Sequence, residues 1–247
     1  NAITNSSINF NGSDLYVTLE PCSNYGKTKP CVEKIIKKKI KKVYIGINDP
    51  DLKSFNKSKF KFKKNKIEVN VGKSSEKIKE FYKSYILYKN NQLPFLTAKL
   101  AVSKDLFTIN KKERWITNEF SRARVHLMRS QHDSIITSSE TVKIDNPFLN
   151  CRINGLESRS PTRIILDNNL KVSINSNIIK NSFKYKTIIF YNKANVRKIK
   201  LLKKLRVKTY KISANKDGNL DLKKVLTKAR LLGFSRIFLE SGIRLTT

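Results

Sequence analysis

Hydrophobic and polar positions in the first ninety residues follow the periods of strands and helices in turn. Three short apolar runs have the length and composition of buried strands: residues 15–19, 43–47 and 67–71. Two stretches carry apolar residues three and four positions apart, which predicts helices over residues 30–42 and 76–89. The lysine-rich stretch 54–66 is interpreted as a solvated loop.

In the remaining chain, the pattern of hydrophobic and polar positions predicts a second set of strands and helices. This set begins after a polar, proline-containing boundary at residues 90–94. Strands are expected at residues 95–102, 134–137, 163–167, 187–191, 207–212 and 236–239. Helices are expected at residues 118–131, 194–204 and 220–232. Strands that alternate with helices indicate an α/β fold with a mostly parallel sheet, so we expect two domains, residues 1–90 and 91–247.

Composition is that of a folded protein. Hydrophobic residues make up 39% of the 247 residues, which argues against disorder. No apolar run is long enough to span a membrane, and residues 1–10 lack the features of a signal peptide, so we expect a cytosolic protein without a membrane partner. The three cysteines do not suggest a disulfide framework.

The formal net charge of +33 is the most unusual bulk property. Taken alone it favours a polyanionic partner, and a basic nucleic-acid-binding protein is one hypothesis. However, the lysines are spread along the whole chain, and no cluster of arginines and aromatics accompanies them. A solvated lysine surface and a phosphorylated small-molecule ligand therefore stay open, and nucleic acid is the less favoured partner.

Candidate metal chemistry lies in the stretch TLEPCSNYGKTKPC, residues 18–31. A strand leads to Cys22, and a predicted helix begins near Cys31, where the helix dipole is expected to lower the pKa of the thiol. Thiolate is the form that binds zinc, so the pair is interpreted as half of a tetrahedral site. Two buried cysteines without a metal are the alternative, and the Glu-Pro-Cys context favours the metal.

This stretch resembles the deaminase domain of the bifunctional riboflavin-biosynthesis deaminase–reductase family (RibD type), which reads TLEPCSHxG(R/K)TPPC. Asn24 replaces the family's histidine, and Lys29 replaces the first proline of the pair. The resemblance implies a cytidine-deaminase-like α/β/α domain in which Cys22 and Cys31 bind Zn²⁺. It also implies that Lys27 and Thr28 contact the substrate.

The family's third zinc ligand and its catalytic glutamate belong to an H-A-E-x-N-A-I helix, which Asn1-Ala2-Ile3 resembles only at its end. We therefore expect the histidine and glutamate to precede Asn1, and no catalytic deaminase residue to lie within the chain. His126 and His132 are interpreted as surface or helix-end residues. We also expect truncation after Thr247, and a fragment that is poorly stable and inactive in reduction.

The resemblance continues through the second half of the chain. Residues 99–105 match the family's K-x-A-x-S-x-D strand, and residues 115–117 match its W-I-T element. Residues 141–152 match T-V-x-x-D-(D/N)-P-x-L-x-x-R, and residues 240–242 stand where the family has E-(G/A)-G. The chain lacks the GxGxxG of ordinary dinucleotide-binding folds, and the resemblance instead implies a dihydrofolate-reductase-like domain.

Ligands of open α/β sheets bind at the carboxyl ends of the strands, where several of these residues are expected. By resemblance, the NADPH contacts are Ala101, Trp115, Thr141, Asp145, Asn168 and Gly242. By resemblance, the substrate contacts are Lys99, Glu113, Arg129, Leu149, Arg152 and Glu240. Two arginines suit a ribose phosphate, because a guanidinium group can bind it through two hydrogen bonds.

The resemblance implies two reactions of riboflavin biosynthesis. The first is zinc-dependent deamination of a diaminopyrimidine ribosyl phosphate, and the second is NADPH-dependent reduction of its ribose to ribityl. The alternative within the family is a reductase whose deaminase domain is a remnant. The family also implies a homo-oligomer.

Overall fold

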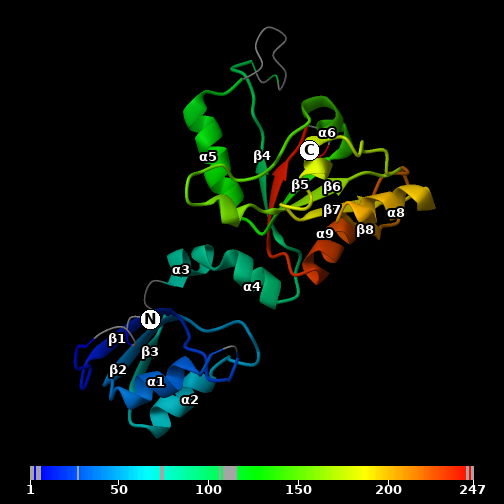
Figure 1. The fold of residues 1–247 in the computed structure, drawn as a ribbon. Coiled ribbons are helices and arrows are strands. Elements are labelled where there is room, and N and C mark those ends of the chain that lie inside the picture. The colour runs from blue at the N-terminus through cyan, green and yellow to red at the C-terminus, as the bar shows by residue number, and fades with distance from the viewer. Residues whose placement is uncertain are drawn as a thin grey trace. The chain divides into compact units, whose positions relative to one another are not determined.

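The computed structural model describes residues 3, 7–26, 28–72, 75–105, 107, 116–242 and 245. The chain divides into two compact units (Figure 1), an N-terminal unit of Asn1–Gln92 and a C-terminal unit of Leu93–Thr247. Among the described residues, no helix combines the length and the apolar character needed to cross a bilayer.

The N-terminal unit is built on a parallel sheet with strand order β1-β2-β3. Its elements are β1 (Asp14–Leu19), α1 (Cys31–Lys37), β2 (Lys42–Ile47), α2 (Lys57–Lys64), β3 (Glu68–Val71), α3 (Ser75–Phe81) and α4 (Lys83–Lys89). Alternate residues of the strands face opposite sides of the sheet. One side, with Val43 and Ile45, packs against Val32 of α1 and Phe62 of α2 and forms a single hydrophobic core.

Three predictions for this unit were wrong at particular residues. The helix predicted over residues 30–42 ends at Lys37, because Lys39 takes a left-handed conformation (φ 53°) that turns Ile40 into the core. The stretch predicted as a loop contains α2, whose Phe62 is fully buried. The helix predicted over residues 76–89 is two helices that meet at Tyr82.

The C-terminal unit contains a six-stranded sheet with the order β4-β9-β5-β6-β7-β8, and all of its pairs are parallel. Its strands are β4 (Phe95–Lys99), β5 (Ser134–Ser138), β6 (Thr162–Leu166), β7 (Thr187–Tyr191), β8 (Lys208–Lys211) and β9 (Arg236–Glu240). Its helices are α5 (Glu119–Ser130), α6 (Ser139–Asp145), the 3₁₀ turn Glu157–Arg159, α7 (Asn177–Lys180), α8 (Val196–Lys204) and α9 (Leu222–Leu231).

Both faces of this sheet are buried, which explains the nearly continuous apolar strands. Ile135 and Ile165 point to the face covered by α5, α7 and α8. Their neighbours Ile136 and Ile164 point to the other face, which α9 covers. The predicted mostly parallel α/β fold is thus confirmed, with the strand predictions correct to within a few residues, whereas α6 and α7 were not predicted.

Candidate active site

The two cysteines of the N-terminal unit lie together. Cys22 follows β1 in the loop, and Cys31 is the first residue of α1. The amide of Cys31 donates a hydrogen bond to Sγ of Cys22 at 3.3 Å, and the amide of Val32 donates to the Cys22 carbonyl oxygen at 3.3 Å. Neither cysteine forms a disulfide. The fold therefore brings the two predicted zinc ligands to one place.

The thiol of Cys31 has a raised pKa, because it is partly removed from water and lies beside Cys22. This direction differs from the lowered pKa that the helix dipole alone predicts for the first residue of α1. A bound cation reverses this shift, since it stabilises thiolate. Cys22 and Cys31 are free and adjacent, and they fit zinc as two thiolate ligands. Among the described residues, they belong to no group of three or more metal-binding side chains.

Glu20, which sequence reasoning used only as context for Cys22, is a buried anchor of this loop. Its carboxylate accepts hydrogen bonds from the amides of Asp49 (3.2 Å), Asn56 (3.1 Å) and Ser58 (3.3 Å). It also accepts one from the Ser58 hydroxyl at 2.7 Å. One carboxylate thereby ties the cysteine loop to the segment that follows β2 and to the start of α2.

In the C-terminal unit, β4 and β9 are neighbours in the sheet (Figure 1), and predicted residues lie at their carboxyl ends. Lys99 ends β4 and pairs in register with Glu240, which ends β9. Asp145 ends α6, and its pKa is raised by burial and by the charge of Glu240, while Lys99 acts in the opposite direction. Lys99, Asp145 and Glu240 therefore lie within electrostatic reach of one another.

Arg129 forms a two-pronged ion pair with Glu240. Its Nε lies 3.0 Å from Oε2 and its Nη2 lies 2.8 Å from Oε1, and both side chains are largely buried. Because helical side chains lean toward the helix N-terminus, Arg129 reaches the carboxyl end of β9 from the last turn of α5. This pairing occupies the donors that were expected to bind a phosphate through two hydrogen bonds, so Arg129 is placed to orient Glu240.

Arg152, in contrast, is exposed, and the uncharged carboxamide of Asn150 accepts a hydrogen bond from its guanidinium group. Its Nη1 donates to Oδ1 of Asn150 at 3.2 Å, and its backbone amide donates to Nδ1 of His126 at 3.2 Å. The carbonyl oxygen of Asn150 accepts from Nη1 of Arg129 at 3.1 Å. Burial and the charges of the two arginines lower the pKa of His126 and favour its neutral form.

Two predicted cofactor residues, Thr141 and Asn168, follow the carboxyl ends of β5 and β6. Thr141 lies in the first turn of α6, with its hydroxyl 2.9 Å from that of Ser138 and 3.3 Å from that of Ser241. Asn168 follows β6 and donates through Nδ2 to the carbonyl of Gly218 at 2.9 Å. Its buried Oδ1 has no hydrogen-bond partner among the described residues, and a donor from a bound cofactor would satisfy it.

The remaining predicted residues lie at the same edge of the sheet, in the core, in the other unit or outside the described residues. Leu149 has a buried side chain in the core and a left-handed backbone (φ 52°), so only its main chain is available to a ligand. Ala101 and Gly242 follow β4 and β9, and Thr28 is exposed on the cysteine loop, which belongs to the other unit. Lys27, Glu113 and Trp115 lie outside the described residues.

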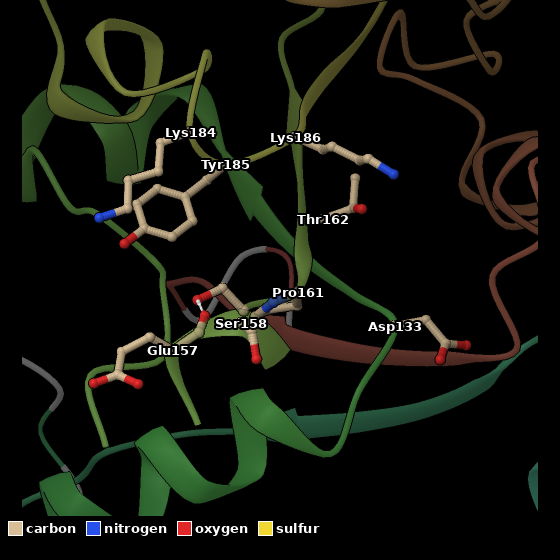
Figure 2. Close-up of a pocket in the computed structure, with 9 residues that line it drawn as sticks. Asp133, Glu157, Ser158, Pro161, Thr162, Lys184, Tyr185 and Lys186 are labelled. Carbon is tan, nitrogen blue, oxygen red and sulfur yellow. Dashed lines mark hydrogen bonds between the residues drawn. The ribbon is translucent and has the colours of Figure 1, made fainter. Parts of the chain in front are cut away.

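A cavity of about 380 Å³ opens at the opposite ends of the strands (Figure 2). It is bordered by Asp133, Thr162 and Lys186, which flank the starts of β5, β6 and β7, and by Tyr185. None of the predicted site residues lines it. We do not assign this cavity as the reaction site, since ligands of such sheets bind at the carboxyl ends of the strands.

Sequence reasoning missed His126, Asn150 and Arg163 as parts of the site or its support. His126 precedes Arg129 by three residues, a spacing that places both on one face of a helix and could have revealed it. His132, expected at the surface or at a helix end, follows the end of α5 and is buried, with Nε2 3.0 Å from the Thr97 hydroxyl and its ring against Phe238. Nothing in the sequence alone signals the contacts of Asn150.

Comparison with known families divides the chain at a similar place. Residues 94–247 match the family described as the RibD C-terminal domain. Residues 1–47 match the cytidine and deoxycytidylate deaminase zinc-binding region. The α/β fold class is therefore confirmed as a cytidine-deaminase-like part followed by a dihydrofolate-reductase-like part.

Individual relatives agree with these matches. The chain is 34% identical over 233 residues to riboflavin biosynthesis protein RibD of Bacillus amyloliquefaciens, covering 94% of this chain and 62% of the relative. It superposes on RibD of Acinetobacter baumannii with a TM-score of 0.82 and 26% identity, covering 96% of this chain and 65% of that one.

A third match is the Thermotoga maritima diaminohydroxyphosphoribosylaminopyrimidine deaminase/5-amino-6-(5-phosphoribosylamino)uracil reductase, with a TM-score of 0.78 and 28% identity. That match covers 95% of this chain and 63% of the other. The chain thus spans less than two thirds of the length of these three relatives.

Proposed function

Because this chain belongs to the family of the RibD C-terminal domain, we propose that it acts in riboflavin biosynthesis as part of a bifunctional deaminase and reductase. The reductase reaction is the NADPH-dependent conversion of the ribose of a phosphorylated aminopyrimidine to ribityl. The observation that carries this proposal is the convergence of Lys99, Asp145 and Glu240 at the carboxyl edge of the six-stranded sheet. Arg152 is connected to this group through Asn150 and Arg129.

In this proposal, the residues divide between cofactor and substrate. Thr141, Asp145, Asn168, Ala101, Trp115 and Gly242 hold NADPH, which supplies the hydride when bound. Lys99 and Arg152 bind the substrate phosphate as cations. Glu240, fixed by Arg129, accepts hydrogen bonds from polar groups of the substrate. Glu113 and the main chain of Leu149 complete the substrate site.

The deaminase reaction is proposed for the full-length protein to which the N-terminal unit belongs, with Cys22 and Cys31 as two of its zinc ligands and Lys27 and Thr28 as substrate contacts. Zinc, when bound, supplies the activation of water that hydrolytic deamination requires. The paired cysteines at the end of β1 and the start of α1 support this assignment. We further propose that the protein assembles as a homo-oligomer and that its ligand is a small molecule rather than nucleic acid.

Binding measurements test the reductase half. We expect the protein to enhance NADPH fluorescence, and to bind ribose 5-phosphate more tightly than ribose in calorimetry. Replacing Lys99 with alanine should weaken ribose 5-phosphate binding roughly tenfold, as expected for loss of a charged contact. Lys208→Ala on the edge strand β8 is the matched control. Unchanged binding in the Lys99 variant would remove the substrate assignment.

Metal analysis tests the deaminase half. The purified protein should contain zinc, and Cys22→Ser and Cys31→Ser should each lower the zinc content, because each removes one thiolate. Cys151→Ser is the control, since Cys151 is buried in the C-terminal unit. Equal zinc in all three variants would contradict the proposed site.

A further inference from the structure

Asn150 forms hydrogen bonds through its backbone carbonyl and both ends of its carboxamide, although it lies in a loop between α6 and β6. The residue is 7% exposed. Its carbonyl oxygen accepts from Arg129 at 3.1 Å, and its Oδ1 accepts from Nη1 of Arg152 at 3.2 Å. Its Nδ2 donates to the hydroxyl of Tyr185 at 3.1 Å. One buried carboxamide thus joins the Arg152 guanidinium to Tyr185.

Tyr185 is itself fixed from its other side. The guanidinium of Arg163, fully buried in β6, lies 5.3 Å from the centre of the Tyr185 ring. Nη2 of Arg163 donates to the Tyr185 carbonyl oxygen at 2.9 Å and to the Thr187 hydroxyl at 2.6 Å. The ring borders the cavity at the amino ends of the strands (Figure 2). The phenol is therefore a rigid anchor for Asn150.

The two arginines at this edge differ in what holds them. Arg129 is paired with a carboxylate, so its charge is largely neutralised by Glu240. Arg152 is held by a carboxamide, and it forms no ion pair with any carboxylate in the described part of the chain. A neutral acceptor restricts the long side chain and leaves its full positive charge available to an anion.

We infer that Tyr185 and Asn150 are positioning residues that hold Arg152 in place to bind the phosphate of the substrate. This inference rests on the proposed function, since it takes Arg152 as a phosphate ligand. A side chain that is already ordered loses less conformational freedom on binding, so its affinity for the ligand is higher. The pair therefore contributes to the preference for a phosphorylated sugar over an unphosphorylated one.

The test uses ribose 5-phosphate and ribose as probes with three variants: Asn150→Ala, Tyr185→Phe and the double variant. Each single variant should weaken ribose 5-phosphate binding roughly three- to tenfold, the loss expected from one hydrogen bond, and leave ribose binding unchanged. The double variant should bind no more weakly than Asn150→Ala, because both changes break the same link. Tyr210→Phe, which removes a phenol hydroxyl from β8, is the matched control.

An Asn150→Asp variant separates positioning from charge. Aspartate keeps an acceptor for Arg152 but adds a negative charge next to the phosphate site, so we expect ribose 5-phosphate binding to weaken further than in Asn150→Ala. If Asn150→Asp instead binds ribose 5-phosphate as tightly as the unaltered protein, the role assigned to the neutral carboxamide is wrong.

Arg152→Ala distinguishes failure of the inference from failure of the proposed function. If Arg152→Ala binds ribose 5-phosphate as tightly as the unaltered protein, the proposed phosphate site is wrong, and the inference fails with it. If Arg152→Ala loses binding while Tyr185→Phe and Asn150→Ala do not, only the inference is overturned. Should Asn150→Ala fail to fold, Tyr185→Phe decides alone, since it keeps the ring under Arg163.

Discussion

Replacing Glu20 should destabilise the N-terminal unit far more than replacing another glutamate of the same unit. The Glu20 side chain is 3% exposed and accepts four hydrogen bonds from Asp49, Asn56 and Ser58. Alanine leaves three amides without this acceptor. Hydrogen bonds to charged groups contribute about 1.5–3 kcal/mol each, and partial rehydration offsets some of the loss, so we expect a loss of about 3–5 kcal/mol.

Glutamine at position 20 gives an intermediate result that checks the reasoning. Its single oxygen can still accept from Asp49 and Asn56, and its amide can donate to the Ser58 hydroxyl, so only the Ser58 amide loses its partner. The expected loss is about 1–3 kcal/mol. Glu33→Gln is the control, because its hydrogen bond to Tyr25 is exposed, and it should change stability by less than about 0.5 kcal/mol.

The assay is urea unfolding followed by circular dichroism, combined with hydrogen exchange of the Asp49, Asn56 and Ser58 amides. In Glu20→Ala these three amides should exchange faster, even under conditions where the C-terminal unit stays folded. Stability within about 1 kcal/mol of the unaltered protein, with unchanged exchange at these amides, would refute the assigned role of the carboxylate.

Three further predictions follow from other contacts. Gly46→Ala should destabilise the protein by about 1–3 kcal/mol, because the added Cβ would clash with Cδ1 of Ile78 and lie 2.7 Å from the Thr18 carbonyl oxygen. Adding Ile78→Ala to this variant should restore only part of the lost stability in urea unfolding. Full restoration would contradict the clash with the Thr18 backbone. Arg129→Met should cost about 3–5 kcal/mol by leaving Glu240 unpaired, and Arg129→Met/Glu240→Leu should recover most of it; a double variant no more stable than the single one would argue against the ion pair. Burial lowers the pKa of His132, so the unfolded state takes up its proton first, and stability should fall as the pH drops below about 6.5; if His132→Gln shows the same loss between pH 7.5 and 5.5, another group is responsible.

The central strands of the six-stranded sheet could be predicted because they are short apolar runs whose side chains are buried. β7 begins and ends where the pattern places it, at Thr187 and Tyr191. The helix α2 could not be predicted in this way, because its many lysines mask the apolar pattern to which Phe62 belongs. In addition, its first turn is held by Glu20, which lies 38 residues before Ser58 in the sequence. Local periodicity carries no information about such a distant partner.

In the candidate site, too, local motifs could be predicted from the sequence, whereas contacts between distant residues could not. Single residues such as Lys99, Arg152 and Glu240 could be identified from short motifs, and the register of β4 with β9 brings two of them together. The pairing of Arg129 with Glu240 joins residues 111 positions apart. The contact between Asn150 and Tyr185 depends on packing of α7 and β7, so these residues have no signature of their own in the sequence.

The strand order of the C-terminal unit also sets a constraint on how the protein is made. Within the described residues, β4 pairs only with β9, although β9 begins more than 130 residues later in the chain. During synthesis, β5 to β8 can pair with one another as they leave the ribosome, whereas β4 has to wait for β9 to be inserted beside it. Such late, long-range pairing slows folding and leaves an unpaired strand edge open to aggregation. We therefore expect residues 95–99 to need protection from aggregation until β9 is inserted beside them.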